Sequence, residues 1–180
     1  MKPMELIIRR AAAKDIGDIA AIYEDIHTRE EAGDMRIGWV RDVYPTKATA
    51  RTGVKAGDMF AALSGGQVLA AARINREQVD VYARAAWQWP APPERVMVMH
   101  TLVVSPAAGG QGIGRAFVRF YEDYALAHDC PFLRIDTNEK NAAARALYKK
   151  LGYREADIVD CVFNGIPGVR LVCLEKRLEI

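Results

Sequence analysis

The stretch LVVSPAAGGQGIGRA, residues 102–116, joins an apolar run to a segment of helical periodicity through a loop rich in glycine. The run that leads into it, Val96–Val104, is apolar except at His100 and Thr101, which predicts a strand buried on both faces. After the loop, apolar residues recur at helical spacing over residues 113–127. The order is therefore strand, glycine loop and helix, and free backbone N–H groups at the positive helix end favour an anion site there.

Two common nucleotide-binding patterns do not fit this loop. The dinucleotide pattern GxGxxG would need a glycine where Arg115 or Phe117 stands, and no Lys followed by Ser or Thr ends the loop as in a P-loop. Taken alone, the loop leaves open the alternative of a glycine-rich turn that holds no ligand.

On both sides of this loop, strand and helix patterns alternate along the chain. The expected elements are a strand at 6–8, a helix from Asp15 to about His27, a helix over 46–57, a hairpin of 59–63 and 68–74, a strand at 132–137, a helix over 144–151 closed by Gly152, and two β-rich segments around Asn164. These elements predict one α/β or α+β domain over residues 1–180, built on a mixed sheet.

Composition narrows the classes of protein that this chain can be. The 180 residues carry 25 Lys and Arg against 23 Asp and Glu, and a net charge of +2 does not indicate a nucleic-acid partner. Charged residues interrupt the apolar runs well before the roughly 18 residues that a membrane span needs. The amino terminus lacks the pattern of a secretory signal. We therefore expect a cytoplasmic protein without a membrane or nucleic-acid partner.

The cysteines and histidines predict no metal site. Cys130, Cys161 and Cys173 are an odd number without CxxC spacing, so neither a disulfide framework nor a zinc site is indicated, and we expect three buried thiols. His27 and His128 do not stand at a spacing from His100 that is typical of metal ligands, so we expect no metal ion.

Two segments together resemble one known family. Residues 102–116 resemble the acetyl-CoA signature of the GNAT N-acetyltransferase superfamily, and RIDTNEKNAAARALYKKLGYRE, residues 134–155, resembles its second motif at the expected distance. The usual first motif is Arg or Gln, two residues, Gly, one residue, and Gly or Ala. Gly112 and Gly114 match it, whereas Gly109 stands where Arg or Gln is usual.

This resemblance implies a GNAT-like mixed, mostly antiparallel sheet with splayed central strands, flanked by helices. It also implies acetyl-CoA as cosubstrate, with the pyrophosphate on backbone amides of the loop and the pantetheine arm along the opened strand edge. The residues that the resemblance assigns to the cosubstrate are Leu102, Val103, Val104, Gly109, Gly110, Gln111, Gly112, Ile113, Gly114, Arg115, Asn141, Ala144 and Tyr148.

Two residues are candidates for proton transfer. Tyr148 matches the family tyrosine whose hydroxyl faces the thioester sulfur, which implies a general acid for the departing thiolate; the alternative is a tyrosine on the apolar stripe of its helix. His100 matches a point where some amine acetyltransferases of the family carry a histidine in the proton path. The alternative for His100 is a hydrogen-bonded core residue.

Charge and aromatic content indicate what kind of acceptor the protein would bind. Seven acids against one base give the segment 15–34 a charge of −6, and in the family this region borders the acceptor site, which favours a cationic amine; a solvated helix face is the alternative. The aromatic side chains that could wall the acceptor pocket, or form a subunit contact in a homodimer, are Trp39, Tyr44, Tyr82, Trp87 and Trp89.

The resemblance implies an enzyme, an N-acetyltransferase of the GNAT type. We expect it to transfer the acetyl group of acetyl-CoA to a primary amine of a small molecule or peptide, by direct attack in a ternary complex. Two alternatives stay open. One is a non-catalytic acyl-CoA-binding sensor or regulatory domain, and the other is an acyltransferase for longer chains or for protein amino termini.

Overall fold

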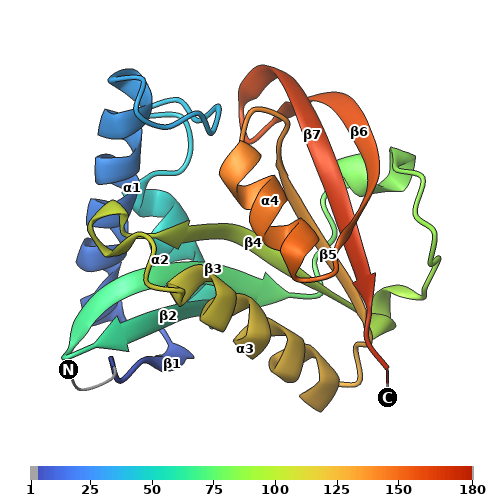
Figure 1. Cartoon of the computed structure of the whole chain (residues 1–180), viewed down its shortest axis with the longest axis horizontal. Coiled ribbons are helices and arrows are strands. Elements are labelled where there is room, and N and C mark those ends of the chain that lie inside the picture. The colour runs from blue at the N-terminus through green and yellow to red at the C-terminus, as the bar shows by residue number, and fades with distance from the viewer. Residues whose placement is uncertain (1–3, 180) are drawn as a thin grey trace.

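A computed structural model describes residues 4–179, and its strands form one seven-stranded sheet in the order β1-β2-β3-β4-β5-β7-β6 (Figure 1). The strands are β1 Ile7–Arg10, β2 Met59–Ser64, β3 Gln67–Asn75, β4 Val96–Val104, β5 Phe132–Asn138, β6 Arg154–Phe163 and β7 Ile166–Arg177. All neighbouring strands are antiparallel except β4 and β5, which are parallel. This arrangement confirms the predicted mixed, mostly antiparallel sheet.

Helices cover both faces of this sheet. They are α1 Ile16–Glu31, α2 Lys47–Ala56, α3 Ile113–Ala127 and α4 Ala142–Lys150, with the short 3-10 turns η1 Ala13–Asp15, η2 Asp80–Arg84, η3 Pro93–Arg95 and η4 Pro106–Ala108. Figure 1 shows α3 and α4 on the near face of the sheet, with α1 and α2 behind it. Within residues 4–179, no helix has both the length and the apolarity needed to cross a membrane.

The strand alternation sends neighbouring side chains into different cores. Met97 and Met99 of β4 pack with Phe117 and Tyr121 of α3 in one fully buried cluster. Val96 and Val98, on the opposite face of β4, join a second cluster with η2, β6 and β7, and a third cluster joins α1 and α2 to β2 and β3. Because the second and third clusters share one face of the sheet, a cleft can form between them.

The parallel pair β4 and β5 separates partway along its length. Paired residues run from Val96 and Phe132 to Met99 and Ile135, after which both strands continue without pairing to each other. At Thr101 the backbone enters the left-handed region with φ 55°, and the register between β3 and β4 shifts at the same place. A β-branched residue rarely adopts this conformation, so the bulge is a strained feature. The predicted splay of the central strands is therefore present.

The splay corrects one expectation about β4. The strand was expected to be buried on both faces throughout, and Val96–Met99 are buried, but His100, Thr101, Leu102 and Val104 are only half-buried. The reason is that β5 leaves this part of the strand uncovered on one edge.

The predicted element boundaries hold at α2 and α4 but not at α1. Gly57 ends α2 in the left-handed conformation with φ 74°, and Gly152 follows α4 with φ 87°. The first helix continues to Glu31 instead of ending near His27, because its last turns bind the loop that follows, as described below. One cysteine also differs: Cys161 is half-buried, whereas the other two are buried as expected.

Candidate active site

The glycine loop presents unpaired backbone amides to an open groove. The first backbone hydrogen bond of α3 runs from the Ala116 amide to the Gly112 carbonyl oxygen at 3.0 Å, so the amides of the first helical turn have no partner within the helix. Gly110 and Gly112 both have φ 76°, and no heavy atom beyond their neighbours lies within 4 Å of where a Cβ would stand. The space that side chains would fill is therefore free for an anion.

Two further glycines have different roles in this loop. A Cβ on Gly114 would stand 3.3 Å from Leu147 Cδ2, so this glycine lets α3 approach α4 closely. Gly109, which replaces the usual Arg or Gln, has an ordinary φ of −59°. The exposed side chain of Arg115 supplies a positive charge at the same groove.

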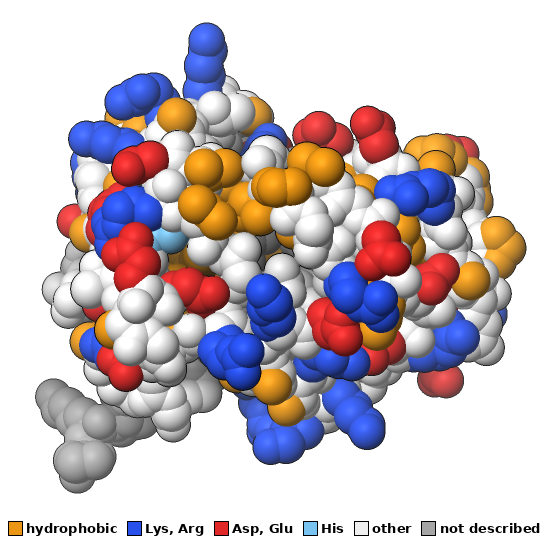
Figure 2. Space-filling model, turned by 90° about the horizontal axis from the view of Figure 1, so that it is seen from above, with side chains coloured by type: hydrophobic (Ala, Val, Ile, Leu, Met, Phe, Trp, Pro, Cys, Tyr) orange, Lys and Arg blue, Asp and Glu red, His pale blue; other side chains and the backbone are white. Residues whose placement is uncertain are grey.

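The groove beside the loop, named here the glycine-loop groove, lies between the end of β4, the loop and α4. Every residue that the family resemblance assigned to the cosubstrate lines it except Gln111, which is exposed. Figure 2, a view from the top of Figure 1, shows hydrophobic side chains gathered around a hollow, with Lys and Arg side chains on one rim. An apolar groove with a cationic rim suits a ligand that is apolar at one end and anionic at the other.

On the other wall of the groove, α4 presents Asn141, Ala144 and Tyr148. The Asn141 side chain caps α4 by accepting from the Ala144 amide at 3.1 Å, which leaves its NH₂ group as a donor. Ala144 and Tyr148 line both this groove and the cavity next to it.

Tyr148 presents its hydroxyl to these spaces. The side chain is 4% exposed, and burial, followed by the charge of Asp136, raises its pKa. Within residues 4–179, no fully buried side-chain oxygen lacks a hydrogen-bond partner. Since no side-chain or backbone group of this part of the chain bonds the Tyr148 hydroxyl, that hydroxyl must be reached from the groove or the cavity. A protonated, accessible hydroxyl is what a general acid requires.

The space between the parted strands is a second site, named here the central cavity. It is walled by Trp39 and Tyr44 of the loop before α2, by Thr101 of β4, by Asp136 of β5 and by Tyr148. Among residues 4–179, Asp136 is the only one in this wall whose side chain is acidic or basic. The Tyr44 hydroxyl and the Thr101 hydroxyl are hydrogen-bonded to each other across it.

A third space, the α2 cleft, opens on the other side of the splay. Its walls include Thr49 of α2, Arg73 of β3, His100 of β4 and Asn164 of the β6–β7 turn. Tyr44, Thr101, Asp136, Phe163 and Asn164 border both this cleft and the central cavity. The three spaces therefore follow one another through the sheet.

His100 stands in the α2 cleft, apart from the cofactor residues. Its Nε2 lies 2.8 Å from Asn75 Oδ1, and Asn75 donates through Nδ2 to Asp58 at 2.7 Å. This orientation leaves Asn75 Oδ1 as an acceptor, so His100 Nε2 carries the proton. Burial, followed by the charge of Arg73, lowers the pKa of His100 to about 4. The imidazole is therefore neutral near pH 7.

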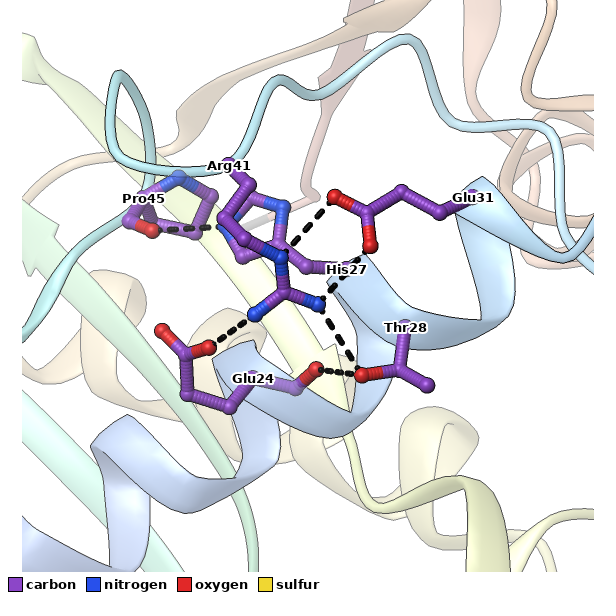
Figure 3. Close-up of polar contacts among 6 residues, drawn as sticks. All are labelled: Glu24, His27, Thr28, Glu31, Arg41 and Pro45. Atoms are coloured by element: carbon purple, nitrogen blue, oxygen red, sulfur yellow. Dashed lines mark hydrogen bonds and ion pairs between the residues drawn. The ribbon is translucent and has the colours of Figure 1, made fainter.

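The acidic side chains of segment 15–34 do not face the site, although Ile26 of the same segment lines the glycine-loop groove. Figure 3 shows Arg41 held between Glu24 and Glu31 of α1, with Arg41 Nε 2.9 Å from Glu31, while His27 Nε2 donates to the Pro45 carbonyl at 2.8 Å. Glu30 accepts the amides of Ile37 and Gly38, the latter at 2.8 Å. None of the seven acids lines the three spaces. Five of the carboxylates, those of Asp15, Glu24, Asp25, Glu30 and Glu31, bind Arg9, Arg29, Arg41 or backbone amides.

The aromatic candidates separate into two groups. Trp39 and Tyr44 wall the central cavity, as expected of acceptor-site residues. Tyr82 and Trp87 instead pack edge to face behind the sheet with ring centroids 5.1 Å apart, and Trp89 lies near Arg134, whose guanidinium donates to its carbonyl.

The sequence interpretation did not single out Asp136, which lines both the central cavity and the α2 cleft. It lies inside the second motif, directly after the first four residues of β5. Three of those four residues are apolar, and the fourth, Arg134, stacks on the ring of Trp87. A carboxylate at that position was a usable signal, because β4 and β5 were already expected to part nearby.

In this fold a glycine loop with free backbone amides stands beside an opened pair of parallel strands, an arrangement that suits an acyltransferase. The family model described as Acetyltransferase (GNAT) family matches residues 19–153, and the chain belongs to that family. The predicted resemblance and the predicted enzyme class are thereby confirmed. The family uses acetyl-CoA as its cosubstrate.

Solved structures share this fold. An acetyltransferase of the GNAT family from Streptococcus agalactiae has a TM-score of 0.79 at 23% identity, over 97% of this chain and 96% of its own. An N-acetyltransferase from Staphylococcus aureus has a TM-score of 0.72 at 19% identity, over 97% and 99%. The ribosomal-protein-S18-alanine N-acetyltransferase from Escherichia coli has a TM-score of 0.65 at 18% identity, over 98% and 96%. At these identities the likeness shows the fold alone.

Proposed function

We propose that this protein transfers an acetyl group from acetyl-CoA to a primary amine of a small molecule or peptide, by direct attack in a ternary complex. The observation that carries the proposal is the continuity of the three spaces through the parted strands. A thioester in the central cavity could be reached from the α2 cleft while its CoA portion lies in the glycine-loop groove. Such an arrangement holds two substrates at once and needs no covalent intermediate on the protein.

The residues of the glycine-loop groove fit acetyl-CoA. The free amides of the loop and of the first turn of α3, together with Arg115, would hold the pyrophosphate. Main-chain groups of Leu102–Val104, left without a β5 partner, would pair with pantetheine amides like an added strand. When bound, acetyl-CoA supplies an acetyl group activated as a thioester.

The chain's own residues then handle the proton at the leaving group. Tyr148 is kept protonated by burial and by the negative charge of Asp136, so its hydroxyl can donate a proton to the departing sulfur. The proton taken up by the sulfur balances the one that the amine nitrogen loses when it becomes an amide. Walls of Trp39, Leu102 and Ala144 limit the access of water to this step.

His100, the base that the sequence predicts, is one of two candidates for taking the proton of the amine, and the other is argued in the next section. Its ring borders the cleft through which the amine would enter, and it is neutral near pH 7 and so can accept a proton. Its hydrogen bond to Asn75 also suits the alternative role of a structural residue. The low pKa makes it a weak base.

Replacement of Tyr148 by Phe tests the proposal. Thiol release from acetyl-CoA with a panel of amines should fall by about 10²-fold or more in kcat, while acetyl-CoA still raises the melting temperature. Tyr153→Phe is the matched control, because Tyr153 is an equally buried neighbour with its ring centroid 5.8 Å from that of Tyr148, and it does not line the three spaces. Equal turnover in both variants would refute the acid role.

The wild-type protein separates the proposed enzyme from a sensor domain. An acyl-CoA sensor would show the thermal shift with acetyl-CoA and release no thiol with any amine. The proposal requires both the shift and the release.

A further inference from the structure

Asp136 occupies the point where β4 and β5 part. It is the first residue of β5 beyond the last pair with β4, Met99 and Ile135, and it still pairs with Cys173 of β7 on its other side. Strand alternation turns Ile135 toward α3 and Asp136 toward the opposite face. Asp136 thereby borders both the central cavity and the α2 cleft, the two spaces that an amine must cross to meet a thioester.

This carboxylate has no positively charged partner. Within residues 4–179 it forms no ion pair, and its one side-chain hydrogen bond comes from the Tyr82 hydroxyl, 2.6 Å from Oδ2. Oδ1 is therefore left for a ligand. Tyr82 is itself 3% exposed and fixed from behind, since Trp87 donates through Nε1 to the Tyr82 carbonyl at 2.8 Å.

We propose that Asp136 is the catalytic base of this site, taking a proton from an acceptor that enters the α2 cleft as an ammonium ion, and that Tyr82 positions its carboxylate. The inference rests on the proposed function and names one more of its residues. We expect cationic primary amines as the substrate class. The reason differs from the charge of the acidic segment 15–34: the buried Asp136 carboxylate in the wall of the cleft has no ion-pair partner within residues 4–179.

Two groups on opposite sides of the splay, Asp136 and Tyr148, account for every proton that is transferred. Asp136 takes one proton from R–NH₃⁺, and the free amine forms the new C–N bond at the thioester carbonyl. The C–S bond breaks, the sulfur takes the Tyr148 proton, and the second proton lost by the nitrogen restores Tyr148. Asp136 then releases its proton to solvent through the α2 cleft. The net products are the amide, the free thiol of CoA and one proton.

The ionisation of Asp136 agrees with this role. Burial raises its pKa to about 6, and the Tyr82 hydrogen bond opposes that rise by stabilising the charged form. The titratable and charged groups around it, from every element that packs there, are Tyr44, Arg73, Glu77, Tyr82, His100, Tyr148, Cys161 and Cys173. A carboxylate that titrates near 6 is charged at pH 7 and still basic enough to take a proton.

The first experiment compares Asp136→Asn with Asp123→Asn, a change at an exposed carboxylate of α3 outside the three spaces. We expect kcat to fall about 10²-fold or more in the first variant and to stay at the wild-type value in the second. Acetyl-CoA should still raise the melting temperature of both, which shows that the fold is intact. A wild-type kcat in Asp136→Asn, or a change in KM for the amine alone, would overturn the base role.

The second experiment needs only variants that keep the carboxylate. The profile of kcat against pH should fall below about pH 6 in the wild type, for two primary amines of clearly different basicity alike. Tyr82→Phe should move this limb up by about one pH unit, because it removes a hydrogen bond to the charged form. His100→Gln should leave the limb in place. A limb that follows His100→Gln, or that follows the basicity of the amine, would overturn the inference.

Failure of the inference can be told apart from failure of the proposed function. No thiol release by the wild type with any amine would refute both. Release by the wild type that Asp136→Asn and Tyr82→Phe leave unchanged would refute the inference alone.

Discussion

Gly112→Ala should abolish acetyl-CoA binding, and Gly57→Ala is the control that shows the effect of backbone strain alone. Gly112 has φ 76° with open space at its Cβ position in the groove, and Gly57 has φ 74° with equally open space at the end of α2, away from the three spaces. A left-handed alanine costs about 1 kcal/mol at either position. Both variants should therefore melt about 2–4 °C lower than the wild type.

The ligand then separates the two variants. At 100 times its Kd, acetyl-CoA should stabilise the wild type by about 2.7 kcal/mol, or about 5–10 °C by differential scanning fluorimetry. Gly57→Ala should keep this shift. Gly112→Ala should lose it, because the methyl group would fill the space beside the amides of α3 in which we propose that the pyrophosphate binds. The reasoning is refuted if Gly112→Ala retains the full shift, or if Gly57→Ala loses it as well.

Two other substitutions test the supports of the site. Tyr121→Phe should lower the free energy of unfolding by about 1–2 kcal/mol, since the fully buried Tyr121 hydroxyl donates to the Met97 carbonyl at 2.6 Å beneath the paired part of β4 and β5. Urea denaturation measures the change, and an unchanged midpoint would contradict it. Arg41→Ala should raise KM for the amine with little change in melting temperature or in acetyl-CoA affinity, because Arg41 ties the loop carrying Trp39 and Tyr44 to exposed carboxylates of α1. Steady-state kinetics with the amine varied checks this, and an unchanged KM would show that the loop holds its place without Arg41.

Much of the fold and of the cofactor site could be predicted from the sequence because its signals are local. A strand, a glycine loop and a helix that follow one another along the chain meet wherever the chain folds, and the amides of the first helical turn lack partners by the geometry of any helix. For the same reason the positions of Gly57 and Gly152 correctly predicted where α2 and α4 end. The second motif likewise predicted that Asn141, Ala144 and Tyr148 belong to one short helix and its cap.

Tertiary structure alone decided which charges face the reaction. The net charge of segment 15–34 is a property of the sequence, but its effect depends on the fold. Arg41 and the amides of the following loop bind Glu24, Glu30 and Glu31, and none of the acids lines the three spaces. His100 likewise met Asn75, 25 residues earlier, which fixes the ring nitrogen that carries the proton, while burial and the charge of Arg73 keep the ring neutral.

The opened sheet completes the site in a way that no local pattern encodes. Asp136 and Tyr82 are 54 residues apart, and only the antiparallel return of β7 and the packing of η2 behind it bring them within 2.6 Å. A carboxylate on a strand is ordinary in sequence, and it becomes a candidate base here because β4 turns away at Thr101 and leaves it facing a cavity instead of a neighbouring strand. Pairing and burial between distant segments set the ionisation of a side chain, and those depend on the folded backbone as a whole.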